Sequence, residues 1–126
     1  MIAVRNTLRV SVREDVSFDS AELLFVDTLF SANRKISLGV FYRPPNGNMN
    51  YLLDLQAALD NVLSSVNSEM VLDGDFNIPE FDWNTNCASV DSPNTTLLSV
   101  VIHDNFLLQL VKDPTRNELQ RGIKCP

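Results

Sequence analysis

One stretch, residues 69–79, constrains the fold more than any other part of this 126-residue chain. It opens with the apolar run Met70–Leu72, which predicts a buried strand, and then breaks into glycine, aspartate, asparagine and proline. Pro79 ends the strand because it removes a donor from the ladder. Side chains two residues apart in a strand point to the same side, so Asp75 and Asn77 should project together. A carboxylate and an amide at a strand end could hold water, a hard cation or a hydrogen-bonding ligand.

A pair of strands is predicted ahead of this stretch. Glu22–Leu29 is rich in β-branched and aromatic residues bounded by polar ones, and Lys35–Tyr42 has the same character. Residues 31–34 are typical of a turn, so the pair should form an antiparallel hairpin. Alternation along the second strand would place Ile36, Leu38, Val40 and Tyr42 on one face and Ser37, Gly39 and Phe41 on the other.

Three further segments carry weaker or negative signals. Ile2–Val4 is a short apolar run that predicts a strand, and its place almost at residue 1 indicates a chain cut from something longer. Arg9–Asp19 alternates weakly and is rich in charge, which predicts an exposed strand or loop. Arg43–Asn48 holds two prolines, which exclude a helix or a central strand, so a loop should begin directly after Tyr42.

A first helix is predicted after this loop. Apolar residues recur at helical spacing from Tyr51 to Val66, and Asn50 is placed to cap the helix. This apolar stripe should face the core rather than a partner protein. The helix would carry the chain back to the strand at residues 70–72, as a crossover connection does.

A second helix and a last strand are predicted near the C-terminus. Ser92 followed by Pro93 fits an N-cap with proline at the first helical position. Leu107–Val111 should be a final apolar strand, and residues 117–126 are polar and aperiodic, which predicts poor order. The buried face of the helix should comprise Leu97, Leu98, Val101, Ile102 and Phe106.

Composition bounds the class of protein. The chain is 44% hydrophobic, enough for one domain with a real core, and no apolar run approaches the roughly 20 residues that cross a bilayer. The start lacks the pattern of a secretory leader, so we expect an intracellular protein, nuclear or cytoplasmic. A net charge of −6 argues against a broad basic surface but leaves a metal-dependent nuclease open. Cys87 and Cys125 should be free thiols.

Three blocks of residues, taken in order, carry a resemblance to a known superfamily. They are Gly39–Asn46, then Gly74–Pro79 with Phe81–Trp83, and finally Leu110–Arg116. Together they resemble the endonuclease/exonuclease/phosphatase superfamily, most closely the endonuclease domains of non-LTR (LINE-type) retrotransposons. The resemblance covers residues 1–116 and leaves 117–126 as a tail outside the domain. It implies an α/β fold: part of a DNase I-like two-sheet sandwich, mostly antiparallel, with helices packed outside.

The same resemblance implies roles for individual residues in Mg²⁺-dependent nicking of DNA. Asp75 would orient or deprotonate the attacking water and serve as a metal ligand. Asn77 would fix that water or the scissile phosphate, and the phenol of Tyr42 would hydrogen-bond the phosphate. Mg²⁺ would stabilise charge that builds up on the phosphate oxygens and the leaving group.

Substrate contacts are implied at Arg43, Asn46 and Trp83. Arg43 could contact a phosphate, with plain solvation as the alternative. Trp83 could stack on a base, but a partly buried loop anchor fits an isolated tryptophan better. His103, near the end of the second helix, should be a solvent-facing or capping residue rather than a catalytic histidine.

The chain also departs from the superfamily pattern. The metal site of the family needs an asparagine and a glutamate on earlier strands, and an aspartate and an Asp-His pair after Arg116, none of which this sequence contains. We therefore expect a domain truncated at both ends, inactive alone, monomeric and, because of the truncation, prone to aggregate. Asp73 replaces an apolar family residue. If Asp73 is buried it should destabilise the strand, and a metal-ligand role is the alternative.

Two other functions stay open on the sequence. The chain could be a non-enzymatic binding remnant of the same fold, or a phosphoesterase of the same superfamily acting on small substrates. For Asp75 and Asn77 themselves, simple turn chemistry is the alternative to a site, since both residue types favour turns.

Overall fold

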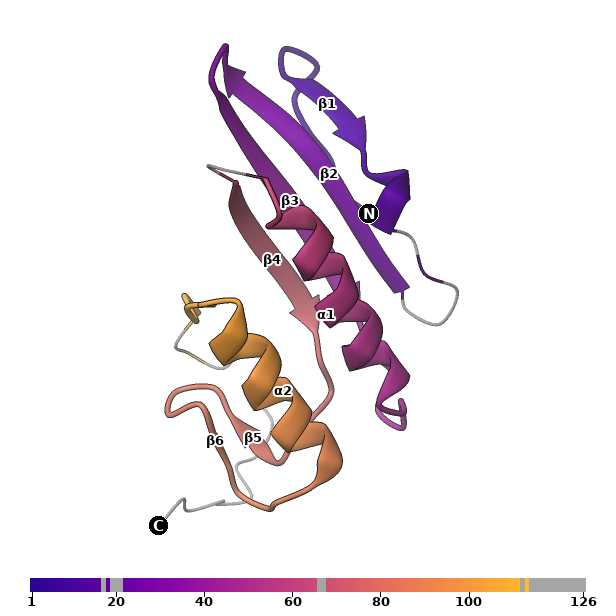
Figure 1. The fold of residues 1–126 in the computed structure, drawn as a ribbon, viewed down its shortest axis with the longest axis vertical. Coiled ribbons are helices and arrows are strands. Elements are labelled where there is room, and N and C mark those ends of the chain that lie inside the picture. The colour runs from indigo at the N-terminus through magenta and orange to yellow at the C-terminus, as the bar shows by residue number, and fades with distance from the viewer. Residues whose placement is uncertain (17, 19–21, 66–67, 112, 114–126) are drawn as a thin grey trace. The chain divides into compact units, whose positions relative to one another are not determined.

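The computed structural model describes residues 1–16, 18, 22–65, 68–111 and 113, and it contains two compact units (Figure 1). The first unit comprises residues 1–77 and the second begins at residue 78. The prediction of a single domain over residues 1–116 stays a prediction.

A four-stranded sheet forms the frame of the first unit. Its strands lie in chain order, β1-β2-β3-β4, with antiparallel pairing between β1 and β2 and between β2 and β3, and parallel pairing between β3 and β4. A short 3₁₀ helix, η1, follows β1. The bounds are β1 Arg9–Val12, η1 Glu14–Val16, β2 Glu22–Ser31, β3 Arg34–Tyr42 and β4 Glu69–Asp75.

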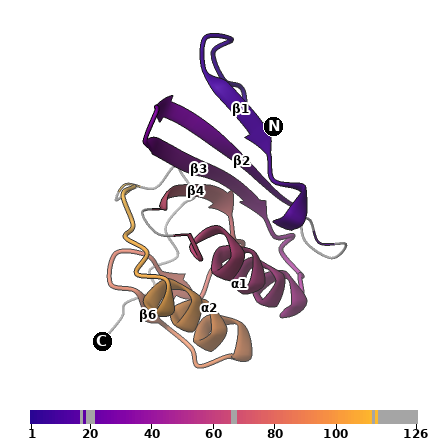
Figure 2. The same ribbon diagram turned by 45° about the horizontal axis from the view of Figure 1, so that its top comes forward.

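The predicted hairpin and crossover are confirmed. β2 and β3 pair from Glu22 opposite Tyr42 to Ser31 opposite Arg34. The helix α1, Asn50–Val62, then connects β3 to the parallel β4, and both views show it running along one face of the sheet (Figures 1 and 2). Parallel strands need such a crossover because the chain must return to the same end of the sheet.

The core of this unit lies between α1 and one face of the sheet. The alternation predicted for β3 is confirmed on its buried face, where Ser37, Gly39 and Phe41 lie inside. A methyl group on Gly39 would collide with the ring of Phe25, so the glycine makes room for that ring. The fully buried residues of the α1 stripe, as predicted, are Leu52, Leu55, Ala58, Leu59 and Val62.

Three predictions for this unit are wrong. Ile2–Val4 forms no strand. Asn50 is the first residue of α1 rather than its cap; Met49 holds the cap position, and the side chain of Asn48 accepts a hydrogen bond from the Asn50 N–H at 3.0 Å. The strand around Met70–Leu72 is β4, and it is not buried: Met70 and Leu72 are half-buried and Val71 is exposed.

The second unit consists of a short hairpin and one helix. Its strands are β5, Phe81–Asp82, and β6, Cys87–Ala88, which pair antiparallel, and its helix is α2, Pro93–Asp104. The predicted start of α2 is confirmed. The Ser92 hydroxyl accepts from the Thr95 N–H at 3.2 Å, and the Thr95 hydroxyl accepts from the Ser92 N–H at 3.0 Å, which makes a reciprocal capping box.

The predictions beyond α2 are wrong where the structure tests them. Leu107–Val111 forms no strand. Phe106 is 89% exposed instead of buried, because the chain turns out of the helix there with Phe106 in the left-handed region at φ 52°. Predictions for residues 114–126, including Cys125, lie outside the described residues. Within the described part of the chain, no helix is long and apolar enough to cross a membrane.

A pair of leucines on α1 tests this account of the core. Leu55 is fully buried and Leu53, on the same helix, is 49% exposed. Leu55→Ala should lower the free energy of unfolding by about 2–5 kcal/mol, because it removes apolar contacts and leaves a cavity. Leu53→Ala should change it by less than about 1 kcal/mol. Urea unfolding measures both, and equal losses would contradict the assigned face of α1.

Candidate functional site

Tyr42 and Asp75 meet where the two parallel strands end. They lie directly opposite one another in the register of β3 and β4. Paired residues of neighbouring strands point to the same face of the sheet, and adjacent strands are about 4.8 Å apart. Both side chains are exposed, with Tyr42 at 38%, whereas the preceding Phe41 points to the buried face. The strand ends therefore present a phenol and a carboxylate side by side to solvent.

Gly74 permits this close approach. A methyl group on it would collide with the carbonyl oxygen of Phe41 on the paired strand. Beyond the strand, the Phe76 ring packs on the Phe41 ring with centroids 5.1 Å apart. The Gly-Asp-Phe part of the motif thus has a packing reason: the glycine admits β3, and the phenylalanine anchors the chain after Asp75.

Asn77 follows β4 and bonds to the segment after β3. Its backbone lies in the left-handed region at φ 47°, which asparagine tolerates better than most residues. Its side-chain Nδ2 donates to the carbonyl oxygen of Arg43 at 2.7 Å. Both interpretations of Asn77, simple turn chemistry and a catalytic role, therefore stay predictions. One amide hydrogen is committed to Arg43, and the contact sets which way the amide faces.

The burial of Arg43 decides against one of the two alternatives that the sequence offered. Only 3% of it is exposed, so plain solvation is wrong. Its guanidinium donates to the carbonyl oxygens of Asn77 at 3.0 Å and Phe76 at 3.4 Å, and also to that of Gly47. Its backbone N–H donates to the Asp75 carbonyl at 2.9 Å. A direct contact with phosphate stays a prediction.

Asn46 and Trp83 lie in different units. Asn46 is exposed in a turn closed by a hydrogen bond from the Gly47 N–H to the Pro44 carbonyl, 2.8 Å long. In the second unit, Trp83 is half-buried and packs edge-on against Phe81, with ring centroids 5.0 Å apart. That contact agrees with the loop-anchor interpretation. Substrate contacts at both residues stay predictions.

Two other polar residues can now be placed. Asp73 is exposed on β4, on the same face as Asp75, so the expected cost of burying its charge does not arise. A ligand role for it stays a prediction. His103 is exposed near the end of α2, 3.5 Å from the Asp104 carboxylate, as a solvent-facing residue should be.

A metal site made by side chains alone needs several ligands close together. Among the side chains that the structure describes, no group of three or more histidine, cysteine, aspartate or glutamate residues could hold an ion. Mg²⁺ needs only one or two protein carboxylates when water and phosphate complete its shell. The exposed carboxylate of Asp75 fits as one such ligand, and the described residues around it do not supply a complete set.

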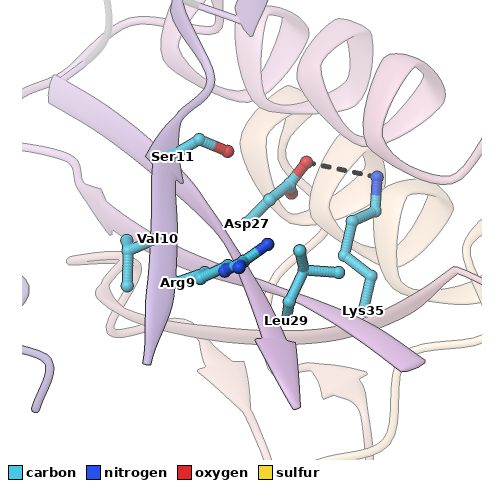
Figure 3. Close-up of a pocket in the computed structure, with 6 residues that line it drawn as sticks. All are labelled: Arg9, Val10, Ser11, Asp27, Leu29 and Lys35. Carbon is cyan, nitrogen blue, oxygen red and sulfur yellow. Dashed lines mark ion pairs between the residues drawn. The ribbon is translucent and has the colours of Figure 1, made fainter. Parts of the chain in front are cut away.

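A buried charge cluster escaped the sequence analysis. A hollow of about 200 Å³, far along β3 from Tyr42, is lined by Arg9, Val10, Ser11, Asp27, Leu29 and Lys35 (Figure 3). Asp27 is the buried member; its carboxylate accepts from the Ser37 hydroxyl at 2.6 Å and pairs with Lys35 at 3.2 Å and Arg13 at 3.4 Å. The sequence did contain a signal for this cluster: Asp27 is a charged residue within the otherwise mostly apolar strand β2.

This cluster shifts the titration of Asp27. Burial opposes the charged form, but the hydrogen bonds from Ser37 and Lys35 and the nearby positive charges outweigh it, so the pKa of Asp27 is lowered. The cluster is therefore a satisfied ionic network within the sheet. We assign it a structural role.

The architecture defines the class of fold. A mixed α/β chain with a mostly antiparallel sheet and two helices is consistent with the DNase I-like α/β fold, as predicted. Neither a family model nor a curated protein sequence matches the chain.

A solved structure shares this fold: the endonuclease domain of TRAS1, a telomere-specific non-LTR retrotransposon. The TM-score is 0.59 and the identity 14%, which establishes likeness of fold, and the match covers 80% of this chain. The chain spans 42% of the TRAS1 structure. The fold that the three sequence blocks implied is thus confirmed.

The Asp27 cluster predicts a dependence of stability on pH. Because the folded-state pKa is lowered, the charged carboxylate stabilises the fold above its ordinary pKa, and this contribution is lost as pH falls through the folded-state value. Asp27→Asn should cost about 1.5–3 kcal/mol near pH 7, the value of hydrogen bonds to a charged group. Urea unfolding at a series of pH values should show the difference shrinking toward acid. A constant difference would contradict the ionic role.

Gly74 offers a test of the strand-end geometry. Gly74→Ala should lower the free energy of unfolding by about 1–3 kcal/mol, since the new methyl group overlaps the Phe41 carbonyl and forces β3 and β4 apart. Asp73→Ala, at the exposed neighbouring position, is the control and should have a much smaller effect. If Gly74→Ala unfolds at the same denaturant concentration as the parent, the close approach of the two strands is wrong.

Proposed function

We propose that this chain supplies the Tyr42, Asp75 and Asn77 corner of a Mg²⁺-dependent phosphodiesterase site, of the kind found in retrotransposon DNA endonucleases. The observation that carries the proposal is the pairing of Tyr42 with Asp75 at the ends of adjacent parallel strands. The fold shared with the TRAS1 endonuclease domain supports it. The substrate would be DNA, and the site of action the nucleus or cytoplasm.

Each side chain suits one task in such a reaction. The exposed Asp75 carboxylate can orient a water or take its proton. The Tyr42 phenol can donate to a phosphate oxygen, which carries more negative charge as the transition state forms. Asn77 keeps one N–H and its Oδ1 for the water or phosphate, since among the described residues its side chain is bonded only to the Arg43 carbonyl. Mg²⁺, when bound, would neutralise charge on the phosphate.

We further propose that the chain does not cleave DNA by itself and that it is a monomer. Two observations support the proposed lack of cleavage. The chain spans 42% of the TRAS1 domain, and no metal-binding group of three side chains occurs among the residues that the structure describes. Asp75 would then be one ligand of an ion whose other ligands lie outside these residues.

Binding of a phosphodiester tests the site without requiring turnover. In a titration of the full chain with the dinucleotide TpT and Mg²⁺, NMR signals of Tyr42 and Asn77 should shift. Tyr42→Phe should weaken binding about tenfold, the loss of one hydrogen bond to a charged group. Tyr51→Phe, which removes a phenol hydroxyl on α1, is the matched control and should change nothing. A parent chain that gives no shifts at these residues contradicts the proposal.

Cleavage is tested with supercoiled plasmid and Mg²⁺. The parent chain should nick no more plasmid than buffer does. Robust cleavage that EDTA stops and Asp75→Ala abolishes would overturn the proposed inactivity while supporting Asp75 as a site residue. Hydrolysis of a small soluble phosphoester without DNA cleavage would favour the phosphoesterase alternative, and a stable complex with a protein partner without TpT binding would favour a binding remnant.

A further inference from the structure

The geometry points to Arg43 as a positioning residue. We infer that its buried guanidinium joins the loop after β3, residues 43–48, to residues 76–77 after β4, and so fixes the positions of Tyr42 and Asn77 relative to each other. The consequence for ligand binding rests on the proposed function. The consequence for the two loops stands on the structure alone.

On the β4 side, Arg43 both donates hydrogen bonds to residues 76–77 and accepts one from Asn77. Its Nη1 donates to the Asn77 carbonyl at 3.0 Å and to the Phe76 carbonyl at 3.4 Å. In return, the Asn77 side chain donates to the Arg43 carbonyl at 2.7 Å. The Arg43 N–H also donates to the Asp75 carbonyl at 2.9 Å, which continues the strand pairing by one residue. Asn77 is therefore fixed at its backbone oxygen and at its amide.

On the β3 side, the same guanidinium holds its own loop. Its Nη2 donates to the Gly47 carbonyl, at the end of the turn that begins at Pro44. Gly47 is buried, and a methyl group there would lie 2.9 Å from the Arg43 Cγ and 3.2 Å from its Nε. The lack of a side chain at Gly47 thus makes room for the arginine under the turn.

Only arginine can make this set of contacts. Its guanidinium is a rigid planar fork with five donors, so one group can serve carbonyls on two loops at fixed angles. Lysine has a single nitrogen at the end of a flexible stem and cannot span the same carbonyls. Loss of the fork would remove the anchor at the Asn77 backbone oxygen and leave the bond from the Asn77 amide to the backbone carbonyl of residue 43.

The test compares Arg43→Met and Arg43→Lys with Arg34→Met in the ¹⁵N-labelled full chain. Arg34 is the matched control because it also links β3 to β4, donating to Glu69 at 3.0 Å at the opposite end of the strands, where its side chain is exposed. Without ligand, Arg43→Met should move the side-chain amide signals of Asn77. It should also raise hydrogen exchange about tenfold or more at the N–H groups of residue 43 and Gly47, which bond to the Asp75 and Pro44 carbonyls, while exchange in α1 stays within about twofold.

In the TpT titration, Arg43→Met should weaken binding about tenfold, and Arg43→Lys should recover only part of that loss. Arg34→Met should change neither readout. Unchanged Asn77 signals in both Arg43 variants overturn the inference, as does an equal effect of Arg34→Met. If Arg43→Met does not fold, Arg43→Lys decides on the same signals. If the parent does not bind TpT, the proposed function fails, and the ligand-free signals of Asn77 still decide the role of Arg43.

Discussion

The parallel pairing of β3 with β4 is the constraint on which the rest of the first unit depends. It needs a crossover, which α1 supplies, and it needs two backbones to approach closely at Phe41 and Gly74. Once both conditions are met, the carboxyl ends of the two strands coincide, and the residues that leave them become neighbours. The candidate site is thus a product of strand register rather than of sequence proximity, since Tyr42 and Asp75 are far apart in the chain.

Charge is distributed unevenly along this sheet, and its two ends use carboxylates in opposite ways. Asp27 is bonded to a hydroxyl and two cations, so both of its carboxylate oxygens have partners within the protein. Asp75 is exposed at a strand end, where water or a cation can reach it. Burial and pairing, and not residue type, therefore separate a structural carboxylate from one that can act on a ligand.

Sequence reasoning succeeded where a pattern is local and strongly periodic. The hairpin from Glu22 to Tyr42, the stripe of α1 and the cap at Ser92 each depend on a few neighbouring residues, and the structure has all three. It failed at Leu107–Val111, where an apolar run has no partner strand among the described residues. It also missed the inward turn of Arg43, because burial of a charged side chain depends on carbonyls brought together by the fold.

The left-handed backbone at Asn77 limits what the presence of an asparagine at this position says about activity. Glycine would accept that conformation but has no side-chain amide. An ionised aspartate would accept it but cannot donate to the Arg43 carbonyl. The fold therefore gives asparagine an advantage over these two residues that does not depend on catalysis. A chain of this fold without catalytic activity would still benefit from asparagine at this position. The presence of Asn77 is therefore not by itself evidence of catalysis.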